Sequence, residues 1–377
     1  MQLESIPEPF RFTFQRRNKK METPIKGRKL SILQVAKVFA ILLVVIGHVN
    51  TLFYRNFNFD WFGFGSWERI GGVDFFFVVT GFMIYYIYHR HFGIKGKTRE
   101  FLLKRFIRIY PLYWMFTFLL LGIAVFFPAL YEPYSMERIW KSILLFPNQP
   151  ILSSAWSLSH VIFFYIMFSL IIFQPKVFKP VMASWVIITI LIKSGLFTQW
   201  DSFFFSFSTL EIVSGSLVAY ISLTYNLKQY ATNFLLVGVT GYFIVWLNNV
   251  YLLFPVYYAP IFFCCFALLM VLGISIKDRT DRKLPSSLVF LGDASYSIYI
   301  AHGPFLILYM LIFRETLLMS SLGYSISMIL ITILSIASSC FVYIWIEKPV
   351  NAYLKKAVFQ KKVTEERNVA TQKLKGA

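Results

Sequence analysis

Long apolar runs recur along the whole chain, and they restrict its fold more than any other feature. Runs of roughly 18–22 residues carry few charges, which is the length that an α-helix needs to cross a hydrocarbon core of about 30 Å. Because lipid offers no partner for free backbone polar groups, each run is expected to be helical. Apolar residues make up 57% of the 377 residues, more than a soluble core of this size needs. The sequence therefore predicts an all-α polytopic membrane protein.

The runs predict a bundle of about ten transmembrane helices. The expected spans are 31–53, 70–88, 107–127, 155–174, 180–198, 207–224, 233–250, 256–275, 287–311 and 322–346. They divide the chain into a basic N-terminal tail (1–30), a membrane domain (31–350) and a charged C-terminal tail (351–377).

The net charge of +19 follows the expected topology. With the N-terminus assigned to the cytoplasm, 31 of the 37 Lys and Arg residues fall in cytoplasmic segments and five in outer loops, while Lys193 falls inside the fifth span. This alternation is the positive-inside pattern, and it predicts that both termini are cytoplasmic. The charge thus indicates orientation in a bilayer, and no nucleic-acid partner is expected. The three cysteines all fall inside spans, so neither a disulfide framework nor a metal site is expected.

The first span contains two ionisable residues, in the stretch KVFAILLVVIGH. Lys37 and His48 are 11 residues apart, which is about 20° after whole turns, so both lie on one face about 16 Å apart along the helix. Ionisable groups inside a membrane are expensive and are candidates for function. Either Lys37 and His48 simply mark the two interfaces, or His48 is a buried proton acceptor.

Asp74 lies near the start of the second span, in GGVDFFFVVTGF, and is expected at about the depth of His48. A carboxylate there would fix the imidazole tautomer, as a general base requires. A purely structural hydrogen bond between the two helices is the alternative. Gly71, Gly72 and Gly81 would permit a close helix approach in either case.

Basic residues lie at the cytoplasmic end of the third span, in KRFIRIYPLYW. Arg105 and Arg108 are three residues apart and share a helix face. That face would suit the phosphates of a nucleotide-bearing cosubstrate, although an interfacial anchor with an aromatic belt is the alternative. Glu347, in WIEKP at the inner end of the last span, is expected to pair with a basic neighbour.

The fourth and ninth spans carry further polar residues, in AWSLSHVIFFY and LGDASYSIYIAH. Such runs usually form hydrogen bonds between helices. His302, expected in the middle of the membrane, is the member that we assign to function. The candidate substrate-binding residues are Trp156, Ser157, His160, Ser295 and Tyr296.

These motifs resemble those of the acyltransferase type 3 family, integral membrane O-acyltransferases that modify bacterial surface polysaccharides and related glycans. The resemblance covers about residues 31–350. Six motifs occur in the family's order: LQVAKVFAILLVVIGH, GGVDFFFVVTGFMI, RFIRIYPLYW, AWSLS with FFY, LGDASYSIYIAH and IEKP. Two positions differ, because Lys37 stands where the family usually has arginine and Val161 where it usually has glutamate.

The resemblance implies acetyl-CoA as the acyl donor, which Lys37, Arg105 and Arg108 would bind. It implies a cell-surface glycan as acceptor, such as lipopolysaccharide O-antigen, capsule, exopolysaccharide or a lipid-linked sugar. The protein would be a multi-pass protein of the bacterial inner (plasma) membrane. His48, oriented by Asp74, would deprotonate a sugar hydroxyl, and an acyl-histidine intermediate is the rival route.

A proton-coupled transporter or flippase of a lipid-linked glycan is the main alternative function. In that case His48 and Asp74 would form a proton relay. Against it, the sequence has no duplicated half with paired broken helices. A purely structural membrane scaffold would leave the clustered ionisable residues unexplained.

Overall fold

The structure is a computed structural model that describes residues 31–61, 63, 70–126, 134–147, 150–255, 258–277 and 284–359. Within these ranges the chain is helical and forms no β-strand. The α-helices are α1 (Ser31–Phe57), α2 (Gly72–Tyr88), α3 (Lys97–Phe126), α4 (Met136–Leu144), α5 (Trp156–Phe173), α6 (Pro175–Lys193), α7 (Phe207–Thr224), α8 (Ala231–Tyr251), α9 (Ala259–Lys277), α10 (Ser286–Glu315) and α11 (Leu318–Val342).

Ten helical segments of the described chain are long and apolar enough to cross a membrane. Each overlaps one of the expected spans, which confirms the all-helical fold of a multi-pass membrane protein over these residues.

Some boundaries differ from those expected. α3 begins at Lys97, well before the expected start at 107. α6 ends at Lys193, so this residue is the last of its span, where it pairs with Asp201 (2.6 Å). After α11, a π-helical turn (Tyr343–Glu347) leads into a C-terminal helix that runs over residues 348–359. The expected N-terminal tail (1–30) and the chain after Phe359 lie outside the described residues.

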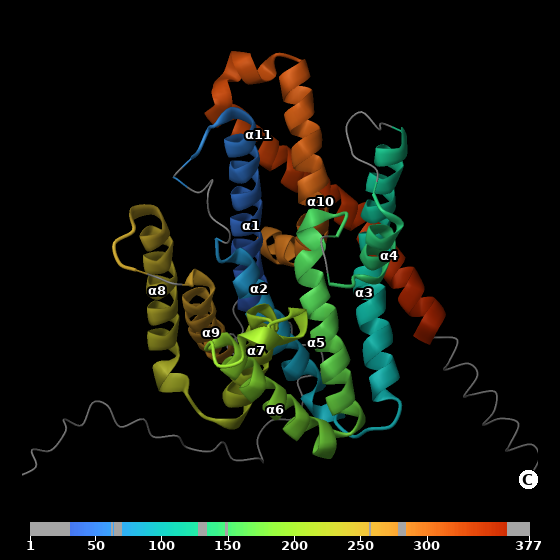
Figure 1. Cartoon of the computed structure of the whole chain (residues 1–377), viewed down its shortest axis with the longest axis vertical. Helices are drawn as coiled ribbons and strands as arrows, with labels where there is room; N and C mark the ends of the chain where they lie inside the picture. The colour runs from blue at the N-terminus through green and yellow to red at the C-terminus, as the bar shows by residue number, and fades with distance from the viewer. Residues whose placement is uncertain are drawn as a thin grey trace, which may run out of the picture.

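The helices form one bundle around α1, α2 and α5. Figure 1 shows α8 and α9 on one side of these helices, and α3 with α4 on the other. The most extensive pairings are those of α2 with α7, α8 with α9, and α10 with both α11 and α1. α10 therefore lies beside α1, which carries His48.

Glycines allow α2 and α7 to cross with their backbones in contact. A Cβ atom at Gly81 would lie 1.6 Å from the carbonyl oxygen of Ile212, and one at Gly215 would lie 2.0 Å from that of Val78. Small residues permit this kind of packing between membrane helices, where lipid removes most of the hydrophobic driving force. Gly81 was expected to face the first helix, but it faces α7.

Two other glycines fix the heights of α2 and α10 against α1. A Cβ at Gly72 would lie 2.7 Å from the carbonyl oxygen of Ala40 and equally close to the Val44 side chain. A Cβ at Gly292 would lie 2.6 Å from the carbonyl oxygen of Gln34. The start of α2 and the first third of α10 are therefore in backbone contact with the lower half of α1 as drawn in Figure 1.

The segment between α3 and α5 is held against α3 by hydrogen bonds. The Tyr113 hydroxyl donates to the Ser142 carbonyl (2.6 Å) and the Trp114 indole to that of Ile143 (2.9 Å). The Ile151 amide then donates to the Ser142 hydroxyl (3.0 Å). These bonds place the residues just before α5, including Ser154, inside the bundle.

Candidate active site

His48 and His302, from α1 and α10, face one another inside the bundle. Their ring centroids are 5.0 Å apart, with the ring planes at 56°. His302 is completely buried, whereas the His48 side chain is exposed. Two of the residues assigned to catalysis from the sequence are thus neighbours, and one of them is accessible to a substrate.

The surroundings of His302 select one tautomer of its ring. Its Nδ1 lies 3.0 Å from the carbonyl oxygen of Ile298. Because a carbonyl only accepts hydrogen bonds, Nδ1 carries the proton and Nε2 keeps its lone pair. Nε2 is buried and has no hydrogen-bond partner among the described residues. A buried acceptor of this kind is expensive unless a donor satisfies it, and the nearest ring is that of His48.

Asp74 does not lie at the depth of His48. Gly72, two residues before it, packs against Ala40 and Val44, which precede His48 by four to eight residues, or about 6–12 Å along the helix axis. Asp74 is fully buried, and its carboxylate acts electrostatically on Tyr242. Glu211 of α7 also acts on that tyrosine. The expected pairing of His48 and Asp74 at one level is therefore corrected: Asp74 enters the bundle below His48, near Glu211.

Ser157 and Tyr299 connect α5 to the histidine pair. Their hydroxyls are 2.6 Å apart, and the Tyr299 hydroxyl also donates to the Ser154 carbonyl. The Tyr299 ring centroid is 6.2 Å from that of His302, one helical turn away. Ser157 was predicted as a site residue, whereas Tyr299 was not singled out from the polar run that contains it. Tyr299 and His302 are three residues apart, so both lie on one face of α10. This spacing could have identified Tyr299 from the sequence.

His160 lies in an aromatic cluster at the start of α5. Its ring stacks on Phe203 (centroids 4.5 Å apart) and meets Trp156 (5.9 Å) and Phe77 (6.1 Å) edge to face. Its Nδ1 lies 3.2 Å from the Thr209 hydroxyl. Trp156 and His160 therefore form one aromatic group beside Ser157.

Ser295 and Tyr296, the other predicted substrate ligands, do not take part in the histidine pair. The Ser295 hydroxyl donates to the Gly292 carbonyl of its own helix (2.8 Å). The Tyr296 hydroxyl donates to the Ile109 carbonyl of α3 (2.6 Å), and its ring lies under the Arg108 guanidinium (5.2 Å). Tyr296 thus belongs to the region where α10 meets α3.

Arg108 forms an ion pair with Glu347, which confirms that Glu347 has a basic partner. The carboxylate is only 1% exposed, whereas the Arg108 side chain is 36% exposed. The Ser297 hydroxyl donates to the same carboxylate (2.5 Å). Glu347 ends the π-helical turn after α11, and such turns occur frequently at functional sites.

Arg105 has a different environment from Arg108. Its guanidinium donates to the Tyr88 hydroxyl (3.2 Å) and lies over the rings of Tyr88, Phe101 and Tyr165 at 5.5–5.9 Å. No carboxylate of the described residues pairs with it. Aromatic faces hold a guanidinium without neutralising its charge, so Arg105 keeps a positive charge that an anion can meet. Lys37 is half-buried on α1, in one continuous helix with His48.

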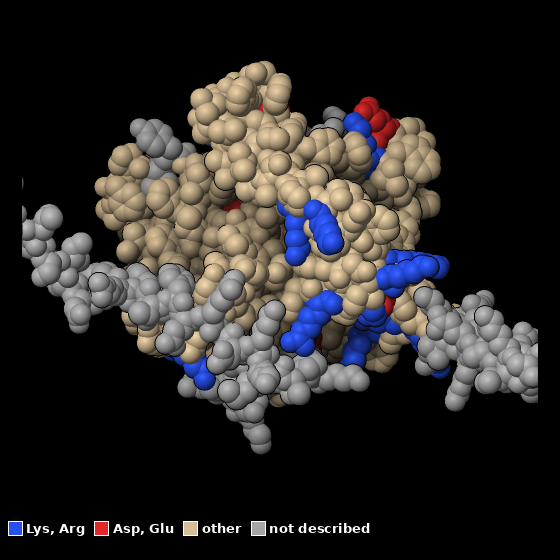
Figure 2. All heavy atoms as spheres, turned by 90° about the horizontal axis from the view of Figure 1, so that it is seen from below, with Lys and Arg blue, Asp and Glu red and all other residues tan. Residues whose placement is uncertain are grey.

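Lys and Arg side chains gather at the end of the molecule that contains Arg105 and Arg108. Figure 2 views this end and shows several of them close together, with few acidic side chains between. The candidate site therefore has two parts, a cationic one near this end and a second one around the two histidines, where Arg55 lies within electrostatic range of His48. α10 joins them, because Tyr296 and His302 are about 9 Å apart along its axis.

Comparison with known proteins gives a family model and a curated relative. A family model described as an acyltransferase domain matches residues 30–344. The chain is 27% identical to the exopolysaccharide production protein ExoZ of Rhizobium meliloti (strain 1021) over 267 residues, which are 61% of this chain and 74% of that protein. No solved structure matches the chain.

Proposed function

The chain belongs to the acyltransferase type 3 family, and from this premise we propose that it transfers an acetyl group from acetyl-CoA to a hydroxyl of a bacterial cell-surface polysaccharide. The relative named for exopolysaccharide production supports a polysaccharide as the acceptor. The observation that carries the catalytic assignment is the pair of facing rings of His48 and His302, one exposed and one buried.

His48 acts as the general base in this proposal, and His302 positions it. A centroid separation of 5.0 Å is close to that of two imidazole rings joined by an N–H···N hydrogen bond, which needs nitrogens about 2.9 Å apart. His302 can only accept in this bond, since its Nδ1 proton is committed to Ile298. Nε2 of His302 has no hydrogen-bond partner among the described residues, and we propose that in the reactive state His48 turns to donate one N–H to it. His48 then presents the lone pair of its other nitrogen to the substrate.

The reaction then proceeds through a tetrahedral intermediate. His48 accepts the proton of a sugar hydroxyl as that oxygen attacks the thioester carbonyl carbon. The carbon–sulfur bond breaks when the intermediate collapses, and His48 returns its proton to the departing thiolate sulfur. The products are an O-acetyl ester and a free thiol, and His48 ends in its starting state. The lone pair of His302 stabilises the imidazolium that His48 forms in between, which is the role that we had expected of Asp74.

Sugar recognition is assigned to the start of α5. The paired hydroxyls of Ser157 and Tyr299 offer a fixed polar group one helical turn from His302. Trp156 lies next to Ser157 and is half-buried. An aromatic face beside hydroxyl groups suits a sugar ring, which has both an apolar face and polar edges.

The cationic part is assigned to the phosphates of the donor. Arg105 suits this role because its charge has no carboxylate partner among the described residues, and a guanidinium binds phosphate in a bidentate manner. Arg108 is neutralised by Glu347, so its contribution is smaller. Lys37 lies on the helix that carries His48, and we propose that it contacts the donor between these two parts.

Acetyl transfer by purified protein tests this proposal. We expect protein in lipid nanodiscs to move labelled acetyl from acetyl-CoA to the polysaccharide of its host with no ion gradient. His48→Ala should lose this transfer while retaining the thermal stability and coenzyme binding of the wild type. Full activity of His48→Ala would overturn the general-base assignment. Movement of a lipid-linked glycan across the membrane without acetylation would instead favour the transporter.

A further inference from the structure

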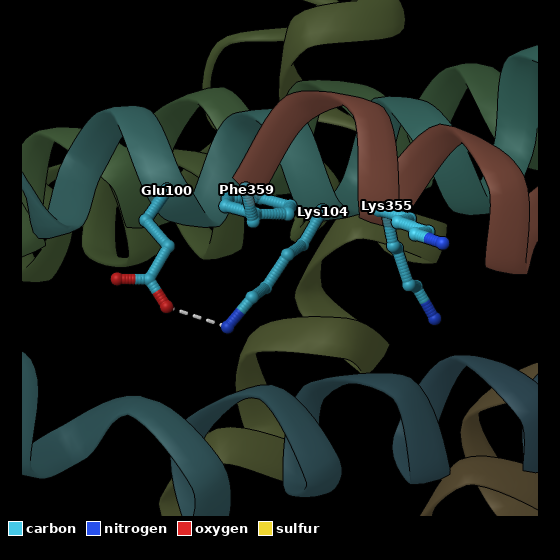
Figure 3. Close-up of a pocket in the computed structure, with 5 residues that line it drawn as sticks. Glu100, Lys104, Lys355 and Phe359 are labelled. Carbon is cyan, nitrogen blue, oxygen red and sulfur yellow. Dashed lines mark hydrogen bonds and ion pairs between the residues drawn. The ribbon is translucent and has the colours of Figure 1, made fainter. Parts of the chain in front are cut away.

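A pocket at the cationic end of the molecule lies between the start of α3 and the C-terminal helix. Its volume is about 530 Å³, within the range of small-molecule sites. The lining residues are Glu100, Lys104, Lys355, Lys356 and Phe359. Figure 3 shows Lys104 and Lys355 projecting in the same direction, with the Phe359 ring beside Lys104. The last three of these residues lie beyond 344, where the family match ends.

Positive charge is concentrated around this pocket. Lys355 lies close enough to Lys104, Arg105 and Arg108 to interact with all three electrostatically. Two carboxylates of the described residues lie nearby, and both are already paired. Glu100 forms ion pairs with Lys97 (2.7 Å) and Lys104 (2.5 Å), and Glu347 forms one with Arg108. These four positive charges repel one another, and an anion bound between them would lower the repulsion. The pocket therefore suits a ligand with phosphate groups.

An aromatic ring adds a second requirement to the ligand. The Phe359 ring lies in the pocket, and the Lys104 ammonium is 5.6 Å from its centroid. An aromatic side chain next to cations is the usual arrangement for stacking a nucleobase while its phosphates are bound. A lipid headgroup would use the cations but not the ring.

Arg108 connects the surroundings of the pocket to α10, the helix that carries His302. Arg108 lies within electrostatic range of Lys355 on one side and packs on Tyr296 of α10 on the other. A ligand held here by one end would extend past Tyr296 toward His302. This arrangement suits a molecule with a phosphorylated nucleotide at one end and a long uncharged arm that carries the reacting group.

We infer that this pocket binds the phosphorylated adenosine end of the acyl donor, with Lys355 and Lys356 on its phosphates and Phe359 against its base. The inference rests on the proposed function for the identity of the donor. Glu100 opposes binding, because it holds Lys104 in an ion pair that the phosphate must replace. The C-terminal helix is then part of the donor site.

Binding of CoA and of adenosine 3′,5′-bisphosphate to protein in phosphatidylcholine nanodiscs tests the inference. The variant Lys355→Gln/Lys356→Gln should raise both Kd values by roughly tenfold or more. Each lysine lost removes a charge-assisted hydrogen bond to a phosphate, and such bonds are stronger than those between neutral groups. Lys228→Gln, which removes one lysine charge at an exposed position before α8, is the control and should leave both values unchanged.

The variant Glu100→Gln should have the opposite effect. Freeing Lys104 should lower the Kd of CoA by roughly threefold, in the range of an exposed ion pair, and a general structural defect would not tighten binding. In transfer assays the lysine variant should raise KM for the donor and leave kcat unchanged.

The outcomes separate this inference from the proposed function. If the wild type binds CoA and transfers acetyl, and the lysine variant binds CoA equally well, the pocket assignment alone is wrong. The binding of phosphatidylglycerol to the wild type and to the lysine variant is measured in the same way. If the variant loses only this lipid binding and binds CoA like the wild type, the pocket is a lipid headgroup site and the assignment is also wrong. If the wild type binds neither probe, both the pocket assignment and the donor in the proposed function are wrong.

Discussion

Two neighbouring stretches of α10 contact chemically different parts of the molecule. Tyr296 and Ser297 face Arg108 and the buried carboxylate of Glu347, whereas His302, about a turn and a half later, faces the ring of His48. In the first region a buried charge is balanced by an opposite charge. In the second region the buried His302 is held by the Ile298 carbonyl, which fixes the direction of the lone pair on its Nε2. The first region thus suits holding α10 in place against α3, and the second suits moving a proton.

The largest effect is expected from Arg108→Ala. This change leaves the buried carboxylate of Glu347 without its cation, and breaking a buried ion pair from one side typically lowers the free energy of unfolding by about 3–5 kcal/mol. Thermal unfolding in detergent measures the loss. The double variant Arg108→Ala/Glu347→Gln should recover part of it, because no uncompensated charge remains. If the double variant is no more stable than Arg108→Ala, the ion pair does not set the stability of this region.

His302→Ala should lower kcat by roughly a hundredfold, at the lower end of what general-base catalysis contributes, and leave KM for the donor unchanged. His302→Asn should retain part of the activity, since its side-chain carbonyl also accepts a hydrogen bond. A positioning role further requires that His302→Ala has no additional effect when His48 is already alanine. Equal losses in both backgrounds would show that His302 acts independently of His48.

Gly292→Ala should affect the histidine region through helix spacing. Its Cβ would lie 2.6 Å from the Gln34 carbonyl oxygen, so α10 must move away from α1, and overpacking of this kind lowers stability by about 1–3 kcal/mol. Acetyl transfer should fall with it, because α1 and α10 carry the two histidines. Gly303→Ala on the same helix meets nothing within 4 Å and is the matched control for thermal stability. Equal stability of the two variants would contradict the contact at Gly292.

Ser157→Ala should have the smallest effect. It removes the hydrogen bond to Tyr299 (2.6 Å), which is worth about 1 kcal/mol when the partner keeps another bond, as Tyr299 does with the Ser154 carbonyl. We expect a several-fold rise in KM for the polysaccharide with little change in KM for the donor, measured by initial rates. A rise in KM for the donor alone would move Ser157 to the cationic region.

The helical spans could be predicted from the sequence because their cause is local. A membrane helix must satisfy its own backbone and present apolar side chains to lipid, so each of the ten segments is visible as an apolar run. The same locality explains why Lys37 and His48 lie on one helix, and why Tyr299 and His302 share a face. Glu347 was expected to have a basic partner, but the sequence did not indicate that this partner would be Arg108 of α3.

The partners of the polar residues were decided only by tertiary structure. His48 was expected to meet Asp74 because both lie near the outer ends of consecutive spans, and that argument assumes that the two helices pack level with each other. Gly72 instead packs on Ala40 and Val44, which puts Asp74 lower, while Gly292 packs on Gln34 and brings His302 beside His48. These heights depend on which backbones approach closely, and a single apolar span carries no information about its neighbour. The sequence alone determined the number and the apolar character of the helices long enough to span a membrane, whereas their packing decided which residue His48 meets.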